Sequence, residues 1–140
     1  MTRIDFHVDL NDKLNYTCRL VKKAYNSRKN LVIFLQDKEQ LKSLDEKLWD
    51  FSVSDYLPHI DIDNPLSFCT PIILTSDFLK MPPHNQILIN LSFNVPEYFA
   101  SFERLFELIS YEENDLIAGR ERYRYYRKRG YLLNHKIIKN

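Results

Sequence analysis

Arginine and tyrosine side chains gather in one segment near the carboxyl end of the chain, residues 111–131, which reads YEENDLIAGRERYRYYRKRGY. A helix turns by about 100° per residue, so four of these side chains would fall on one side, within about a third of the circumference. They are Arg120, Tyr123, Arg124 and Arg127, with Tyr125, Tyr126 and Tyr131 nearby. Arginine offers paired planar donors to carboxylates and phosphates, and tyrosine supplies rigid apolar surface. The segment therefore predicts a surface that binds an anionic ligand.

Two classes of ligand fit this surface. One is single-stranded nucleic acid, with arginines on phosphates and tyrosines stacked on bases. The other is an acidic peptide, ideally one that ends in a free carboxylate beside an apolar side chain. The chain has 20 Lys and Arg against 19 Asp and Glu, a net charge of +1, which slightly favours the peptide. A plain solvated helix also has acids first and bases last, because this order complements the helix dipole.

Residues that could carry catalysis or hold a metal or cofactor are scattered. The four histidines lie in separate segments, without the spacing of a helical metal pair, and two cysteines alone cannot form a metal cage. Only two glycines occur, Gly119 and Gly130, so no glycine-rich loop for a phosphate can be written. We therefore expect no catalytic residue, no cofactor and no metal. An enzyme remains an alternative that rests on fold analogy alone.

Apolar periodicity predicts the elements that position these residues. Strands are expected at residues 3–8, 31–35, 72–74 and 87–91, where apolar residues alternate or run continuously. Helical spacing marks residues 13–27, a segment capped by Asp37 that ends near Trp49, a segment spanning 99–109, and a last helix. That last helix would be capped by Asn114 or Asp115 and end near residue 129, before Gly130. Residues 50–70 lack periodicity and are expected to be irregular.

The order of these segments predicts the fold class. Strand–helix–strand–helix favours a parallel sheet with right-handed crossovers. With 140 residues, we expect a single three-layer α/β domain over residues 1–140. Its mostly parallel sheet would have a nucleotide-binding-like topology without a phosphate loop. No run of about 20 apolar residues and no signal-peptide pattern occur, so we expect a cytoplasmic protein without membrane contact.

Two blocks of the sequence resemble a known family. LDEKLWDFSVSDYLPH, residues 44–59, resembles the L-D-x-x-L-W…F-x-P-H block of the chi subunit of bacterial DNA polymerase III. YEENDLIAGRERYRYYRKRGYLLN, residues 111–134, resembles the family's carboxyl-terminal signature, in which an RxRYxxYR core precedes a small residue, a glycine and an aromatic. The first strand reads like the family's xFYxL opening. The two blocks cover about 40 of 140 residues, and the order of elements is similar over the whole chain.

The resemblance implies a noncatalytic accessory subunit on the clamp-loader side of the replicative DNA polymerase. One surface would bind the psi subunit, if one is present. Another would receive the acidic, apolar-ended tail of single-stranded-DNA-binding protein, so that contact with single-stranded DNA is indirect. By position in the family's motifs, the tail-binding candidates are Trp49, Ile109, Arg120, Tyr123 and Arg124, and Arg127 is added to them as a further candidate. Leu116 departs from some relatives, which carry a basic residue there, so either one charge contact is missing or Arg127 supplies it.

The resemblance also implies a division of roles among these candidates. Arg120 and Arg124 would pair with the acids or the terminal carboxylate of the tail. Trp49, Ile109 and Tyr123 would form an apolar pocket for its last side chain. A direct single-strand-binding module built on the same helix remains the alternative to this adaptor.

Overall fold

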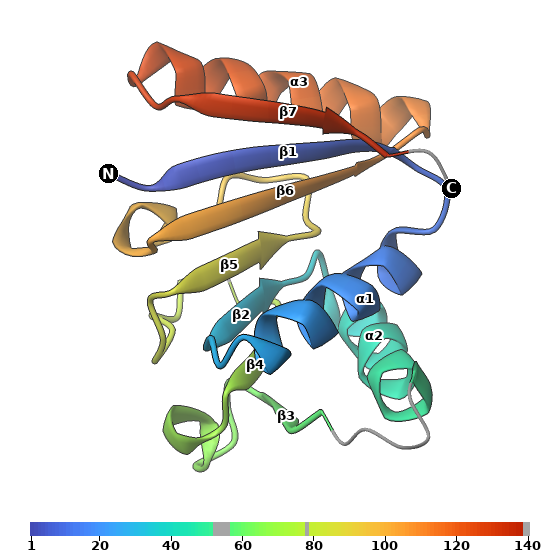
Figure 1. Cartoon of the computed structure of the whole chain (residues 1–140), viewed down its shortest axis with the longest axis vertical. Helices are drawn as coiled ribbons and strands as arrows, with labels where there is room; N and C mark the ends of the chain where they lie inside the picture. Colours follow the sequence, from blue (N-terminus) through green and yellow to red (C-terminus); the bar gives the residue numbers. More distant parts are fainter. Residues whose placement is uncertain (52–56, 78, 139–140) are drawn as a thin grey trace.

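Seven parallel strands form one sheet in the computed structural model, which describes residues 1–51, 57–77 and 79–138. The strand order is β3-β4-β2-β5-β6-β1-β7 (Figure 1). The strands are β1 (Arg3–Leu10), β2 (Leu31–Phe34), β3 (His59–Asp61), β4 (Ile72–Thr75), β5 (Ile87–Asn90), β6 (Arg104–Ser110) and β7 (Leu133–Ile137). The expected α/β fold with a parallel sheet is confirmed.

Helices cover both faces of the sheet and make three layers. On one face lie α1 (Lys13–Asn26) and α2 (Lys38–Phe51), and α3 (Glu113–Lys128) lies on the other (Figure 1). Two short 3₁₀ turns, η1 (Ser67–Cys69) and η2 (Phe99–Ser101), complete the described elements. None of the described helices combines the length and the apolar character that crossing a membrane requires.

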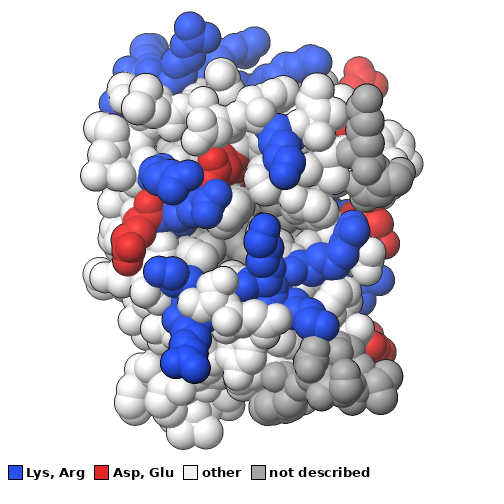
Figure 2. All heavy atoms as spheres, viewed as in Figure 1, with Lys and Arg blue, Asp and Glu red and all other residues white. Residues whose placement is uncertain are grey.

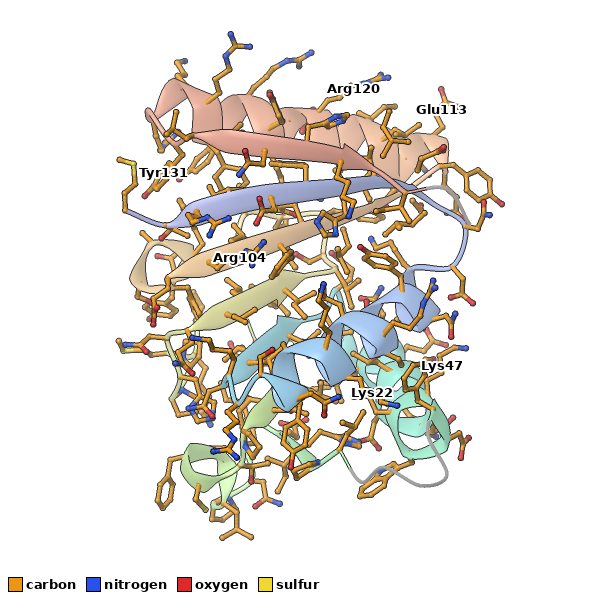
Figure 3. All side chains as sticks on the ribbon, in the orientation of Figure 1. Lys22, Lys47, Arg104, Glu113, Arg120 and Tyr131 are labelled. Atoms are coloured by element: carbon orange, nitrogen blue, oxygen red, sulfur yellow. The ribbon has the colours of Figure 1, made fainter. Side chains whose placement is uncertain are left out.

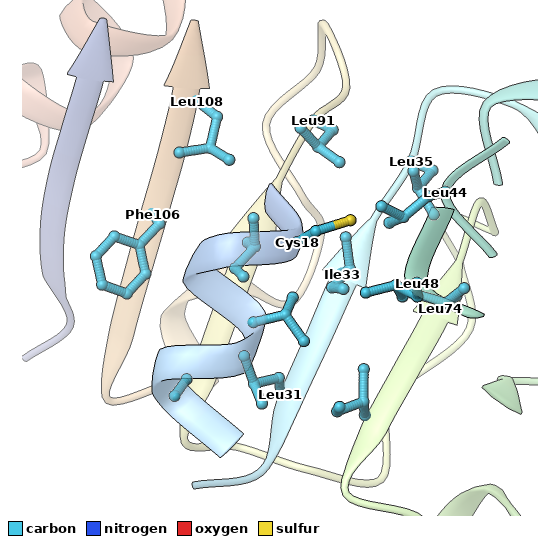
Figure 4. Packing of buried hydrophobic residues seen from close by; sticks show 14 of the residues in the cluster. Cys18, Leu31, Ile33, Leu35, Leu44, Leu48, Leu74, Leu91, Phe106 and Leu108 are labelled. Carbon is cyan, nitrogen blue, oxygen red and sulfur yellow. The ribbon is translucent and has the colours of Figure 1, made fainter. Parts of the chain in front are cut away.

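Strand β2 shows why the sheet needs helices on both sides. All four of its residues are buried, and they alternate between two apolar clusters. Ile33 faces the α1 and α2 layer, where Cys18 and Leu44 pack around it (Figure 4). Val32 and Phe34 face the opposite cluster, which also holds Tyr126 of α3. A strand buried on both faces reads as a continuous apolar run, as was predicted for this segment.

The first two helices begin at side-chain caps. Asp12 accepts a hydrogen bond from the backbone N–H of Asn15 at 3.0 Å at the start of α1. Asp37 accepts one from the backbone N–H of Gln40 at 2.8 Å, as predicted for α2. The Gln40 side chain reaches back to the N–H of Gln36, also at 2.8 Å. These bonds satisfy amide groups that a helix leaves unpaired at its first turn.

The helix predicted across residues 99–109 is wrong. The segment forms the turn η2 followed by strand β6, which lies between β5 and β1. Every residue from Leu105 to Ser110 is buried, because both faces of this strand are covered. This segment has apolar residues at nearly every position, so it also contains the spacing of three and four that is typical of a helix. The sequence pattern therefore could not distinguish this strand from an apolar helix.

Part of the region expected to be irregular is a strand. Residues His59–Asp61 pair with β4 and form the edge strand β3. Three residues are too few to produce a readable period, which is why the sequence pattern did not predict this strand. Residues 52–56, inside the family-like block 44–59, lie outside the described residues.

Candidate partner-binding surface

Helix α3 carries the exposed arginines, and the order of its charged residues complements the helix dipole. Acidic side chains occupy its first turn and Arg127 and Lys128 its last. Gly130 follows with a φ of +85°, a left-handed conformation that favours glycine, as predicted. The predicted cap at Asn114 or Asp115 is wrong, because the cap position is Glu112, whose side chain makes no capping hydrogen bond.

Asp115 instead ties the first turn of α3 to the rest of the molecule. Its Oδ2 accepts hydrogen bonds from the backbone N–H of Ser110 at 2.7 Å and from Lys13 Nζ at 3.0 Å. Lys13 Nζ also donates to the carbonyl oxygen of Leu91 at 3.2 Å. Burial lowers the pKa of Lys13, and the Asp115 carboxylate opposes that shift. The start of α3 is thereby joined to α1 and to the carboxyl ends of β5 and β6.

A buried carboxylate holds the middle of α3 against the sheet. Glu107 in β6 is fully buried and accepts hydrogen bonds from Arg122 Nε at 3.0 Å and Tyr126 Oη at 2.6 Å. Asn90 Nδ2 lies 3.0 Å from both carboxylate oxygens. Burial raises the pKa of Glu107, while Arg122, Tyr126 and Asn90 act against that shift. Arg122 and Tyr126, which lie one turn apart on α3, therefore both bind Glu107 of β6.

Sequence reasoning assigned no role to Arg122, although a signal for it was present. Glu107 is the one carboxylate inside the apolar run LFELI. A charge in a strand buried on both faces needs a partner, because an unpaired buried charge is very unfavourable. The arginine of α3 that points toward the sheet is that partner.

A glycine lets α3 approach the sheet closely. A Cβ atom placed on Gly119 would lie 2.4 Å from Cδ1 and 3.1 Å from Cγ1 of Ile109 in β6. Ile109 is only 4% exposed and belongs to the core cluster on this face. The candidate Ile109 thus lies beneath the helix, where it packs against α3.

The tyrosines of this region mostly pack against other aromatic rings. Tyr123 lies edge-on to Phe6 of β1, with ring centroids 5.1 Å apart. Tyr125 and Tyr131 contact Phe99, and the guanidinium of Arg129 covers the Tyr125 ring at 3.5 Å. Tyr126, expected to add flat surface, is fully buried. Tyr123 is partly exposed at the edge of this cluster. The four tyrosines therefore cannot all stack on nucleic-acid bases.

Three candidate arginines on α3 face solvent. Arg120, Arg124 and Arg127 are all exposed, and Figure 3 labels Arg120 on the helix. Over residues 1–51, 57–77 and 79–138, none of the three forms an ion pair with a carboxylate. Four residues form one helical turn, so the three guanidinium groups follow one side of α3 for about 10 Å. The surface made by Arg120, Tyr123, Arg124 and Arg127 is called the α3 face below.

The structure does not bring Trp49 to the α3 face. Trp49 is 51% exposed near the end of α2 and packs at a tilt against His59 of β3, with ring centroids 4.6 Å apart and the ring planes at 50°. Tyr123 packs on Phe6 of β1, and β3 and β1 are five positions apart in the sheet. Strands are spaced by about 4.8 Å, which separates the two sites by about 24 Å. In Figure 3, Arg120 of α3 lies at the top of the molecule, whereas Lys47 of α2 lies well below it.

The chain is similar to known proteins over most of its length. The family model described as "DNA polymerase III chi subunit, HolC" matches residues 1–134. The chain is similar to DNA polymerase III subunit chi of Pseudomonas aeruginosa, with 33% identity over 144 residues and 98% of each chain covered. It is also similar to the proteins of that name from Haemophilus influenzae (25% identity) and Escherichia coli (26% identity). Those two matches cover 84% of this chain and 81% and 80% of the relatives.

Proposed function

Because the chain belongs to the DNA polymerase III chi subunit family, and so is a replication accessory subunit, we propose that it acts as a noncatalytic adaptor. The α3 face binds the acidic carboxyl-terminal tail of single-stranded-DNA-binding protein. A psi subunit is the second partner and links the chain to the clamp loader. In the cytoplasm, the adaptor holds the polymerase assembly close to coated single-stranded DNA.

The observation that carries this proposal is the row of unpaired guanidinium groups on a firmly anchored helix. Arg120, Arg124 and Arg127 are exposed and free of carboxylate partners in the described part of the chain. Paired donors on planar guanidinium groups suit carboxylates, and several acids in an extended peptide can meet three of them over about 10 Å. The hydrogen bonds that Arg122 and Tyr126 donate to Glu107 hold the helix, so little order has to be gained on binding.

Apolar contact for the end of the tail comes from the same helix. Tyr123 is partly exposed beside the arginines, and Ile117, two turns before Arg124, is 48% exposed. Ile109 supports this site from below rather than touching the ligand. Trp49 would be reached only by a tail that continues across the molecule, so we assign it to a separate contact.

The mechanism of the adaptor is tethering. A tail that binds with a micromolar dissociation constant gains about −8 kcal/mol. Many tails are presented on one coated strand, so a weak single contact is reinforced by rebinding. The contact also weakens as ionic strength rises, because exposed charge pairs are screened by salt.

Titration with a synthetic acidic peptide that ends in an apolar residue and a free carboxylate tests the proposal. We expect micromolar binding by the parent chain. Arg124→Ala and Tyr123→Ala should each weaken binding by about 1–3 kcal/mol, as truncated anchors do. Lys42→Ala is the matched control, because it removes one exposed positive charge from α2 and should leave affinity unchanged.

Two further arms decide between alternatives. Trp49→Ala should leave the affinity for a short peptide unchanged and lower it only for a longer tail. Equal binding by the parent, Arg124→Ala and Tyr123→Ala would overturn the α3 face as the site. Oligonucleotide binding that is tighter than peptide binding and is lost in the same variants would favour the direct nucleic-acid-binding alternative on α3.

A further inference from the structure

Part of one face of the sheet is left without a helix. On the side of α1 and α2, strands β1 and β7 have no helix in front of them in Figure 1. The side chains of β1 alternate between the two faces. Ile4 and Phe6 enter the core beneath α3, and Asp5 and His7 lie on the side without a helix. Parallel sheets are normally covered on both faces, so this part of the sheet without a helix is unusual.

The open face forms a hollow of about 590 Å³ between α1 and strands β6, β1 and β7. We call it the α1 groove. Five cationic side chains line it, from α1, the loop after α1, β6 and β7: Arg19, Lys23, Lys29, Arg104 and Lys136. Figure 2 shows Lys and Arg side chains gathered around a hollow in the middle of this face. The whole chain carries a net charge of only +1, so positive charge is concentrated at this place.

The single carboxylate that lines the groove is already occupied. Asp5 Oδ2 accepts a hydrogen bond from Arg104 Nε at 2.7 Å, and Oδ1 accepts one from Asn134 Nδ2 at 3.0 Å. In the described part of the chain, the other four cations make no ion pair with a carboxylate. Their charges are therefore available to a ligand.

Flat surface lies beside these charges. Tyr16 of α1 is half-buried at the groove wall, where it bonds to His7 Nδ1 at 2.6 Å, and Arg19 lies over its ring at 5.6 Å. Phe106 forms part of the floor beneath Arg104, whose guanidinium lies 4.4 Å from the ring centroid. Cations spread along an open groove with an aromatic wall suit an extended polyanion better than one isolated anion.

We propose that the α1 groove binds the phosphodiester backbone of single-stranded DNA directly. The nature of the ligand rests on the family assignment to a DNA polymerase subunit, whereas the site is separate from the α3 face. The cations of α1 and β7 form opposite walls that contact successive phosphates, and Tyr16 offers a ring edge to one base. An acidic protein segment is the rival occupant, and the test separates the two.

The test measures binding of a fluorescent oligodeoxythymidine of about 16 nucleotides by anisotropy at low and moderate salt. Lys23→Glu combined with Lys136→Glu reverses one exposed charge on each wall of the groove. We expect this variant to bind at least about tenfold more weakly than the parent at low salt. Lys38→Glu combined with Lys42→Glu on α2 changes net charge equally and should alter affinity by less than about twofold.

Salt dependence and the peptide give independent readouts. Lys23→Ala should reduce the slope of log affinity against log salt by about 0.7, the value for one single-strand phosphate contact. Arg120→Glu combined with Arg124→Glu should abolish tail-peptide binding and leave oligonucleotide binding intact. If the tail peptide fails to bind the parent while the groove results hold, the proposed tail site is wrong and the groove stands.

Three outcomes would overturn the groove proposal. The first is no oligonucleotide binding at low salt. The second is an equal loss in the groove variant and the α2 control, which would mean that only net charge matters. The third is a groove variant that loses affinity for acidic peptide but not for DNA, which would assign the groove to a protein partner.

Discussion

Two kinds of arginine share helix α3, and their positions give them opposite environments. Arg122 is 2% exposed and donates to Glu107, whereas Arg124, two residues later, is exposed. Two residues correspond to about 200° around a helix, so one side chain points into the sheet and the other toward solvent. The angular position of each arginine on the helix, rather than its type, decides whether it anchors the helix or is available to a partner.

Replacing the buried carboxylate should therefore affect stability more than any exposed change. We expect Glu107→Gln to lower the free energy of unfolding by about 3–5 kcal/mol, because Arg122 would keep its charge in the core without a counter-charge. Urea unfolding followed by circular dichroism at pH 7 measures the loss. Glu103→Gln, an exposed change just before the same strand, is the control and should shift stability by at most about 0.5 kcal/mol. A loss below about 1 kcal/mol for Glu107→Gln would refute the anchoring role.

At the level of elements, the packing of α3 on β6 depends on the missing side chain at Gly119. Ile109 would have to move to admit even one methyl group there. Helices pack closely on sheets only where small residues permit it, and overfilled cores lose stability. This close packing sets the height of the α3 face above the sheet.

A double-mutant cycle tests that packing. Gly119→Ala should lower stability by about 1 kcal/mol, because the overpacking cost exceeds the gain in helix propensity. In the Ile109→Ala background the space is free, so the same change should raise stability by up to about 1 kcal/mol. Thermal or urea unfolding of the four proteins gives the coupling energy. Equal effects of Gly119→Ala in both backgrounds would show that the two residues do not compete for space.

The two neighbouring elements β6 and α3 also show where local pattern succeeds and fails. The sequence predicted α3 and its final Gly130, because charge order and a positive-φ glycine are local properties. The same reasoning wrongly predicted a helix at residues 99–109, because a strand with apolar residues at nearly every position fits both the helical period and the strand period. Burial on both faces, which depends on β5, β1 and α3, decided in favour of a strand.

Over the whole molecule, the two proposed binding surfaces lie on opposite faces of the sheet. The α3 face is built on the helix that packs with Phe6 and Ile109, and the α1 groove opens on the other side of β1. Ligands on the two surfaces would not touch. Such an arrangement would let the chain hold a protein tail and bare DNA at the same time.

The placement of the two proposed sites on opposite faces predicts that both ligands bind at the same time. The tail peptide should bind with a dissociation constant within about twofold of its free value when the chain is saturated with oligonucleotide. Two-colour anisotropy, with a different dye on each ligand, measures both events in one sample. Mutual displacement of the ligands would indicate one shared site, contrary to the opposite-face arrangement.

The sequence alone determined the α/β class, most of the elements and the phase of the arginines on α3, because these depend on residues close together in the chain. It also indicated the family through blocks such as RERYRYYR. It did not reveal the distance between Trp49 and Tyr123. The family motifs place these two residues in one site, but they can form it only in a fold that brings α2 beside α3.

Tertiary structure decided the sites that combine distant segments. Arg19, Arg104 and Lys136 meet in one groove only because β1 lies between β6 and β7, with α1 packed beside them. The net charge of the chain is only +1, because acidic residues elsewhere offset these cations, so composition does not indicate the groove. The physical reason is that periodicity records which way each side chain points along its own element, whereas strand order determines which elements become neighbours.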